Sequence, residues 1–362
     1  MGSKHRHRTV ARSANPRSFV TAAEVACVAR VSRSAVSRTF TPGASVSRQI
    51  RERVIKAADR LGYRVNRLAQ GLIRARSNLV GIVGTTIGMP FHATLLAGLS
   101  EALLSEDFDC MLFNAANAER DLGTIIERVL EYRVSAIVVM SGMPPSWIVE
   151  KATASGVPVI LINKSMPKLM VDSVVSDHVA GGRAAAQQLI GAGCRNLAVV
   201  SSADRTFSLL GRIRGFRNYA GGVGVAVTLW EEGPTSYETG QNAARALAAT
   251  GRIDAAFCVT DIIALGFLDA ARRDLGMRVP EDLSVIGFDD IPQAGWGSYR
   301  LTTFRQDVPD LARAVVAALN RRMHDATARP DTTVLRAKLI ERETVAGARQ
   351  PIEAPIALEF AR

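Results

Sequence analysis

Acidic side chains are the first candidates for catalysis, and their spacing argues against it. Asp289 and Asp290 are adjacent and follow the apolar run 284–287. On an extended segment neighbouring side chains point to opposite faces, so these carboxylates are not expected to share a proton as a catalytic pair does. The chain contains no HExxH, P-loop or GxSxG motif, and its five histidines lack metal-ligand spacing. We therefore expect no enzyme, no metal and no cofactor.

Basic side chains are concentrated in one segment. Residues 1–77 hold 17 Lys and Arg against three acids, a net charge of +14, whereas the other 285 residues hold 28 against 31. Such a field suits a polyanion, although a solvated basic face is the simpler alternative. Nucleic acid is favoured over an anionic membrane surface because no long amphipathic helix with an aromatic-rich apolar face accompanies the charge.

The basic segment carries the start and stop signals of three short helices. Thr21 and Glu24 have capping-box spacing, so a helix is expected to begin there. Ser32 can cap a second helix and Ser47 a third, which Gly62 would end. A helix, a tight turn, a second helix, a loop and a third helix form the helix-turn-helix layout.

The remainder of the chain alternates apolar runs of strand length with amphipathic helical stretches. Strands are expected at 79–84, 110–113, 136–140, 157–162, 197–200, 225–230, 255–259 and 284–287, and helices near 92–105, 119–131, 179–191, 237–249 and 262–275. Strands this apolar are buried on both faces, which predicts the α/β class, with parallel sheets covered by helices. About 280 residues is large for one such sheet, so two lobes are expected.

Several short strings, in this order and spacing, resemble the lac repressor/galactose repressor family from about residue 19 to residue 342. The strings are VSRSAVSR at 31–38, VS at 46–47, LGY at 61–63, NRLA at 66–69, VGIV at 80–83, GF at 215–216, VPEDLSVIGFDD at 279–290 and LTT at 301–303. The resemblance implies an all-α helix-turn-helix headpiece, a hinge that folds on operator DNA, and a core like the periplasmic sugar-binding proteins.

The resemblance also divides the chain into expected parts. In the core, the chain is expected to cross between two lobes three times. The expected parts are a disordered basic tail (1–18), the headpiece (19–63), the hinge (64–77), a first lobe (78–176 plus 306–335), a second lobe (177–304 plus 336–342) and a C-terminal tail (343–362).

The sequence departs from the family pattern at two places. Arg30 stands where the family usually has a glycine, in a turn that favours positive φ, and a residue with a side chain costs about 1 kcal/mol there. Asn163 and Lys164 stand where an Asp-Arg pair is common. This second departure bears on the chemical class of the effector.

The resemblance implies a set of DNA-binding residues. Arg33 would bond guanine in the major groove, with Ser34 beside it, and Ser37 and Arg38 would contact phosphates. Leu72 would wedge between base pairs in the minor groove. The alternative is that the helix residues only face solvent and that Leu72 is a packing residue. The full set is Thr21, Ser32, Arg33, Ser34, Ser37, Arg38, Asn66, Arg67, Ala69 and Leu72.

A second set of residues would bind an effector in the cleft between the lobes. Arg212 matches the family's effector-binding arginine, and Asp289 can accept from two sugar hydroxyls. The alternatives are a structural ion pair for Arg212 and Asp289, and core packing for the aromatic residues. Lys164 and Arg212 facing one pocket favour a sugar acid over a neutral sugar. The full set is Phe91, Lys164, His178, Arg212, Asp261, Asp289 and Trp296.

These inferences predict a homodimeric transcriptional regulator, more often a repressor, that binds a palindromic double-stranded operator under control of a small effector. The chain has no apolar run of about 20 residues, no apolar region near its start and no CxxC pair, so a cytoplasmic protein without a membrane partner is expected. Pro351 and Pro355 and the lack of a heptad repeat argue against a tetramer. The alternative is a cytoplasmic sugar-processing enzyme or binding module that carries a DNA-binding arm.

Overall fold

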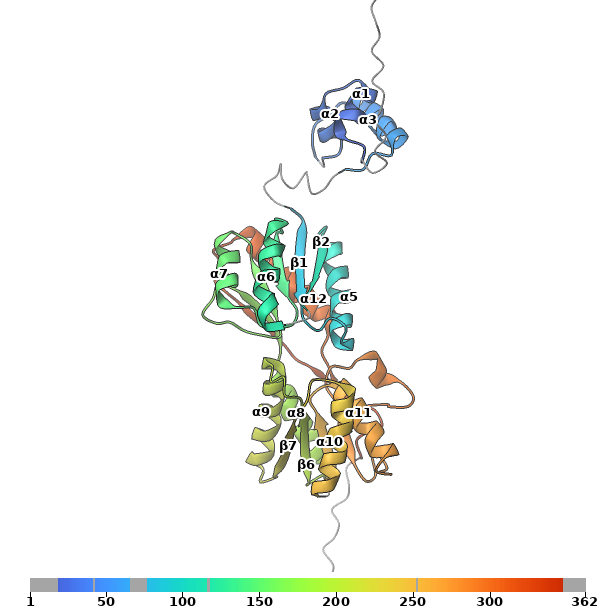
Figure 1. Ribbon diagram of the computed structural model, residues 1–362, viewed down its shortest axis with the longest axis vertical. Coiled ribbons are helices and arrows are strands. Elements are labelled where there is room, and N and C mark those ends of the chain that lie inside the picture. Colours follow the sequence, from blue (N-terminus) through green and yellow to red (C-terminus); the bar gives the residue numbers. More distant parts are fainter. Residues whose placement is uncertain (1–18, 42, 66–76, 116–117, 252, 348–362) are drawn as a thin grey trace, which may run out of the picture. The chain divides into compact units, whose positions relative to one another are not determined.

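The computed structural model describes residues 19–41, 43–65, 77–115, 118–251 and 253–347. The predicted basic tail and most of the predicted hinge therefore lie outside the described residues. The chain forms two compact units, Met1–Ser77 and Asn78–Arg362, which are described separately (Figure 1). In the described part, no helix is long and apolar enough to cross a membrane.

The first unit contains the helices α1 (Ala22–Ala29), α2 (Arg33–Thr39) and α3 (Arg48–Leu61). The predicted helix starts are confirmed, because the side chains of Thr21, Ser32 and Ser47 each accept a backbone N–H of the first turn. The three helices pack around the buried side chains of Val25, Val36 and Val54. The hydrophobic effect thus holds α2 on α1 and α3 with its other face free.

The first lobe of the second unit is a parallel sheet of strand order β11-β5-β4-β3-β1-β2. The strands are β1 (Leu79–Gly84), β2 (Asp109–Asn114), β3 (Ala136–Val139), β4 (Val159–Ile162), β5 (Asp172–Ser176) and β11 (Thr332–Leu335). Helices α5 (Pro90–Ser105) and α12 (Val308–His324) pack on one face, and α6 (Ala118–Glu131) and α7 (Ser146–Ala154) on the other (Figure 1).

The second lobe is a parallel sheet of order β7-β6-β8-β9. Its strands are β6 (Leu197–Ser201), β7 (Val227–Glu231), β8 (Ala255–Cys258) and β9 (Ser284–Ile286). Its helices are α8 (His178–Gly191), α9 (Phe207–Gly222), α10 (Tyr237–Thr250), α11 (Asp261–Arg273) and the 3-10 helix η1 (Pro292–Gly295). Strands β10 (Thr303–Arg305) and β12 (Lys338–Ile340) pair antiparallel beside it. Parallel sheets covered by helices confirm the predicted fold class.

The chain passes from one lobe to the other three times: between β5 and α8, between β10 and α12, and between β11 and β12. The predicted start of the C-terminal tail at 343 is wrong. Thr344 is fully buried, its hydroxyl donates to the Val285 carbonyl, and its own carbonyl accepts from the Val285 N–H. Residues 343–346 therefore belong to the second lobe.

Arg30, the residue that ends α1, adopts φ 53° and ψ 52°, as the family resemblance predicted. A glycine has no Cβ to strain in this left-handed region, so Arg30→Gly should stabilise the headpiece by roughly 0.5–1 kcal/mol. Arg60→Gly, in the last turn of α3, is the matched control and should destabilise it by roughly the same amount. Hydrogen exchange of the α1 amides in the full chain, read by mass spectrometry, measures both. Faster exchange in Arg30→Gly would contradict the argument.

Candidate DNA interface and effector site

Helix α2 presents a polar face to solvent. Val36 and Thr39 are buried, whereas Arg33, Ser34, Ser37 and Arg38 are exposed. Arg33 is the first residue of the helix, and Ser34 lies within 2.8 Å of the capping Ser32 hydroxyl. No described residue forms an ion pair with Arg33 or Arg38. The two guanidinium groups are therefore free to meet an external acceptor.

Other predicted DNA-binding residues have structural partners or lie outside the described residues. Thr21 caps α1, and its N–H donates to the Glu24 carboxylate at 2.7 Å. Arg51, which was not predicted as a contact, donates to the Thr39 carbonyl at 3.0 Å and so fixes α3 against the end of α2. The hinge residues Asn66, Arg67, Ala69 and Leu72 are outside the described residues.

Arg212 is the centre of the polar site in the core. Its side chain is buried, and its Cζ lies 3.7 Å from the centre of the Phe288 ring. Its Nη2 donates to Asp289 Oδ1 at 3.0 Å, its Nη1 to the Val259 carbonyl at 2.5 Å, and its Nε to His178 Nδ1 at 3.3 Å. Burial lowers the pKa of Arg212, and the Asp289 charge opposes that shift. The guanidinium is thus held in one orientation.

Helices α8 and α9 can bring Arg212 to His178 because small residues line their contact. A Cβ at Gly182 would lie 2.0 Å from the Arg212 carbonyl oxygen, and a Cβ at Gly211 would lie 2.9 Å from the His178 Cβ. Any side chain at Gly182 would meet backbone, which cannot yield as a flexible side chain can. Glycine at these positions therefore sets the separation of the two helices and the position of Arg212.

His178, the first residue of α8, is held in one tautomer by its two neighbours. Its Nδ1 accepts from Arg212, so the proton of the neutral ring sits on Nε2, which donates to Asn163 Oδ1 at 3.2 Å. Burial lowers the pKa of His178 well below its usual value, and the Arg212 charge adds to the effect. The ring is therefore neutral and serves as a directional link between the two lobes.

Gln306 joins this network where the chain crosses back to the first lobe. Its Nε2 donates to Asp289 Oδ1 at 2.7 Å. Its Oε1 accepts from Asn163 Nδ2 at 2.9 Å and from the Ser176 hydroxyl at 2.7 Å. We call Asn163, Ser176, His178, Arg212, Asp289 and Gln306 the inter-lobe network. Three of these residues, Asn163, Ser176 and Gln306, were not predicted from the sequence as site residues, although the Asn163-Lys164 pair departs from the family pattern.

Lys164 and Phe91 lie near the network in the first lobe. The Lys164 ammonium donates to the carbonyls of Met140 at 3.1 Å and Ile162 at 3.0 Å, and no described carboxylate pairs with it. Its burial lowers its pKa to about 7. Phe91, at the start of α5, packs against the hydrophobic cores of both lobes. Phe91 therefore lies where the lobes meet, and Lys164 is buried in the first lobe next to Asn163 of the network.

Asp261 and Trp296 differ from the other predicted effector residues. Asp261, the first residue of α11, accepts from the Thr303 hydroxyl at 2.5 Å and from the Ile291 N–H at 2.9 Å. Burial, with the nearby Asp289 charge, raises its pKa to about 7. This carboxylate fixes loops within the second lobe. The Trp296 side chain is 57% exposed, and its ring stacks on none of the predicted effector residues that the structure describes.

The expectation that Asp289 and Asp290 lie on an extended segment is wrong. Their φ angles are 122° and 54°, in the region that favours glycine. The two carboxylates nevertheless have separate partners, because Asp290 binds Arg305 at 2.6 Å and Arg342 at 2.6 Å while Asp289 binds Arg212. Each carboxylate faces its own cations, so these two carboxylates do not share a proton.

Two family models match the chain. Residues 21–66 match the bacterial regulatory proteins of the lacI family, and residues 186–345 match a periplasmic binding protein-like domain. The first match identifies residues 21–66 as a domain of the lacI family of bacterial regulatory proteins, and the second places residues 186–345 among the periplasmic binding protein-like domains. The described residues contain no group of three or more His, Cys, Asp or Glu that could hold a metal ion.

Relatives and solved structures cover almost the whole chain. Catabolite control protein A of Priestia megaterium is 29% identical over 85% of this chain and 94% of its own. The ribose operon repressor of Haemophilus influenzae is 25% identical over 90% and 99%. A structure of the regulator CelR with cellobiose is 27% identical, covers 90% and 99%, and has a TM-score of 0.67. An operator-bound lac repressor dimer, 24% identical over 91% and 100% with a TM-score of 0.83, shares the fold.

The buried Arg212–Asp289 pair gives a stability prediction. Asp289→Asn leaves a buried guanidinium without its counter-charge, which should cost about 3–5 kcal/mol of core stability. Asp274→Asn, which breaks the half-exposed pair with Arg245, is the control and should cost under about 1 kcal/mol. Urea unfolding followed by tryptophan fluorescence measures both, since all three tryptophans, Trp147, Trp230 and Trp296, belong to the second unit. An equal loss of unfolding free energy in the two variants would contradict the view that this ion pair is central to the core.

Proposed function

We propose that the protein is a transcriptional repressor that binds operator DNA through its helix-turn-helix headpiece and is controlled by a small ligand between the lobes of its core. The observation that carries this proposal is the inter-lobe network. Its buried polar groups come from both lobes and from a crossing segment, and the same chain carries a basic headpiece with exposed arginines. A sugar-processing enzyme is not favoured, because the buried Asp289 is committed to Arg212 and Gln306.

The DNA-binding role rests on charge and exposure. Arg33 begins α2 and is exposed, in the place from which a recognition helix reaches base edges in the major groove. Arg38 is exposed nearer the end of the same helix and suits a phosphate contact. The hinge residues Asn66, Arg67, Ala69 and Leu72 are proposed to complete the interface in the minor groove.

The effector role rests on the chemistry of the residues between the lobes. Arg212, Asp289, His178 and Asn163 offer directional donors and acceptors, which suit vicinal hydroxyls, and the buried Lys164 suits a negative group. CelR binds cellobiose, and the Haemophilus relative is named for the ribose operon. A sugar or sugar acid is therefore the proposed effector class, with Phe91 and Asp261 bordering the site and Trp296 a more distant member.

Ligand control requires that the effector prefer one arrangement of the lobes. An effector that bonds both Lys164 in the first lobe and Arg212 in the second stabilises closure, and a coupling of about 1–3 kcal/mol changes operator affinity about 5–150-fold.

We further propose that the protein acts in the cytoplasm as a homodimer. One headpiece reads only a few base pairs, and two-fold pairing gives a palindromic site.

The DNA-binding proposal predicts different results for two arginines of one helix. Arg33→Ala should cost about 1–3 kcal/mol on the preferred operator and relax the preference at one position of each half-site, because a bidentate guanine contact is lost. Arg38→Ala, the matched control, should weaken binding to all sequences alike. Selection of operators from a random duplex library with both variants measures this. Unchanged site preference in Arg33→Ala would show that another residue reads the bases.

The effector proposal predicts a pH dependence set by Lys164. The ammonium is protonated below its pKa of about 7, so an anionic sugar should bind about tenfold more weakly at pH 8 than at pH 6. Burial also lowers the pKa of the neighbouring His92, so this ring is expected to contribute little charge. Lys164→Met should weaken the pH dependence and leave only the part that comes from Asp261, whose pKa is also about 7, whereas Lys168→Met, at an exposed lysine, should leave it unchanged. Titration calorimetry with a sugar acid found by thermal-shift screening measures the affinity. A pH profile that Lys164→Met leaves unchanged would exclude this lysine from the site.

A further inference from the structure

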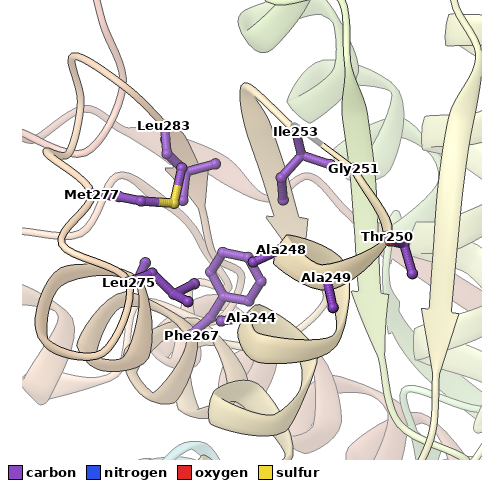
Figure 2. Close-up of a pocket in the computed structure, with 11 residues that line it drawn as sticks. Ala244, Ala248, Ala249, Thr250, Gly251, Ile253, Phe267, Leu275, Met277 and Leu283 are labelled. Carbon is purple, nitrogen blue, oxygen red and sulfur yellow. The ribbon is translucent and has the colours of Figure 1, made fainter.

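An apolar pocket of about 480 Å³ opens at the end of the second lobe that α10 and α11 share (Figure 2). In Figure 2 the Phe267 ring forms its floor, with Leu275, Met277 and Leu283 on one side and Ile253 on the other. The lining residues are Ala244, Ala248, Ala249, Thr250, Gly251, Ile253, Phe267, Ala271, Leu275, Met277 and Leu283. None of them carries a charge, so the pocket suits an apolar occupant and not the polar effector.

The rim of this pocket is open to water. Leu275 is 36% exposed, and Ala248 and Ala249 at the end of α10 are exposed as well, whereas Phe267 and Leu283 beneath them are buried. An apolar hollow that water enters loses the stabilisation that burial of its walls would give, about 25 cal/mol per Å². A segment that fills it would recover that stabilisation.

The last described residues run toward the pocket. The Val285 N–H donates to the Thr344 carbonyl at 2.7 Å, and the Ala346 N–H donates to the Ser284 hydroxyl at 3.2 Å. Thr344 thus pairs with Val285, and Ala346, two residues later, pairs with Ser284, which precedes Val285 at the start of β9. The chain therefore passes β9 in the antiparallel direction, toward Leu283 in the pocket wall.

The sequence that follows Gly347 has the pattern of an extended apolar ridge. Apolar residues recur at every second position from 352 to 360, and two of the residues between them are glutamates. The alternating apolar residues are Ile352, Ala354, Ile356, Leu358 and Phe360. Period-2 alternation places them on one face of an extended segment, and Pro351 and Pro355 favour an extended backbone. Residues 348–362 reach at most about 50 Å when extended, far more than the width of the pocket.

We propose that residues 352–360 dock in this pocket and place Ile356, Leu358 and Phe360 against Phe267, Met277 and Leu275. The tether between Gly347 and the docking residues is short, so the effective concentration of the segment at the pocket is in the millimolar range. The segment thereby covers the apolar end of the second lobe in each copy of the chain.

The test uses full-length proteins and a labelled synthetic peptide of residues 348–362. In the wild-type chain its own segment occupies the pocket and excludes the peptide. Leu358→Glu in the protein should release the pocket, so peptide affinity should rise at least about tenfold over wild type. Ala357→Glu adds the same charge on the opposite face of the segment and should leave the affinity as in wild type. Fluorescence anisotropy measures all three proteins.

A second pair of variants tests the pocket side. In the Leu358→Glu protein, adding Ala248→Glu at the rim should abolish peptide binding, whereas Ala246→Glu, which does not line the pocket, should leave it unchanged. Circular dichroism verifies that each variant is folded. Equal peptide affinity for wild type and Leu358→Glu, or binding that Ala248→Glu leaves intact, would overturn the proposal. Self-association of the wild-type chain that Ala248→Glu abolishes would assign the pocket to a second copy and overturn it as well.

Discussion

The buried ion pair between Arg212 and Asp289 is the constraint on which the arrangement of the core depends. Two opposite charges in the interior are stable only when their remaining hydrogen-bonding groups also have partners. Arg212 finds them in the Val259 carbonyl and His178, and Asp289 finds Gln306. Because Gln306 lies on a crossing segment and bonds Asn163 of the first lobe, satisfying the ion pair also fixes how the lobes meet.

The headpiece and the buried strands could be predicted from local sequence because their signals are local. Cap residues and apolar runs act within a few positions of the chain. Helices α7, α9 and α12 were not predicted. For α9 the reason is that it contains four glycines and forms through its close contact with α8 at Gly182 and Gly215. Strand β5 was missed for a related reason. Its Asp172 is buried because two arginines about 150 residues later, Arg321 and Arg322, pair with it at 2.6 Å and 2.7 Å.

The core site was predictable where short family strings fall on it and not elsewhere. Arg212, His178 and Asp289 were predicted and contact one another as a chain of hydrogen bonds. Gln306 carries no local signal, because its importance comes from a position on a crossing segment that only the folded topology defines. Asn163 had a signal, its departure from the common Asp. Trp296 was predicted because it is aromatic and lies near a helix start or strand end, and neither feature determines where a half-exposed ring lies.

Lys164 differs energetically from the hydrogen-bonded groups of this network. Its two hydrogen bonds go to neutral carbonyls, and burial without a counter-charge disfavours its protonated form. The inter-lobe network, in contrast, pairs its charges internally. A ligand that brings a negative group to Lys164 therefore gains the interaction that the folded chain does not provide there, but it must also match or displace the hydrogen bonds between Arg212, His178 and Asn163. Ligand binding and lobe arrangement are coupled because both are decided by the same few buried polar atoms, whose loss of a partner costs about 1–3 kcal/mol each.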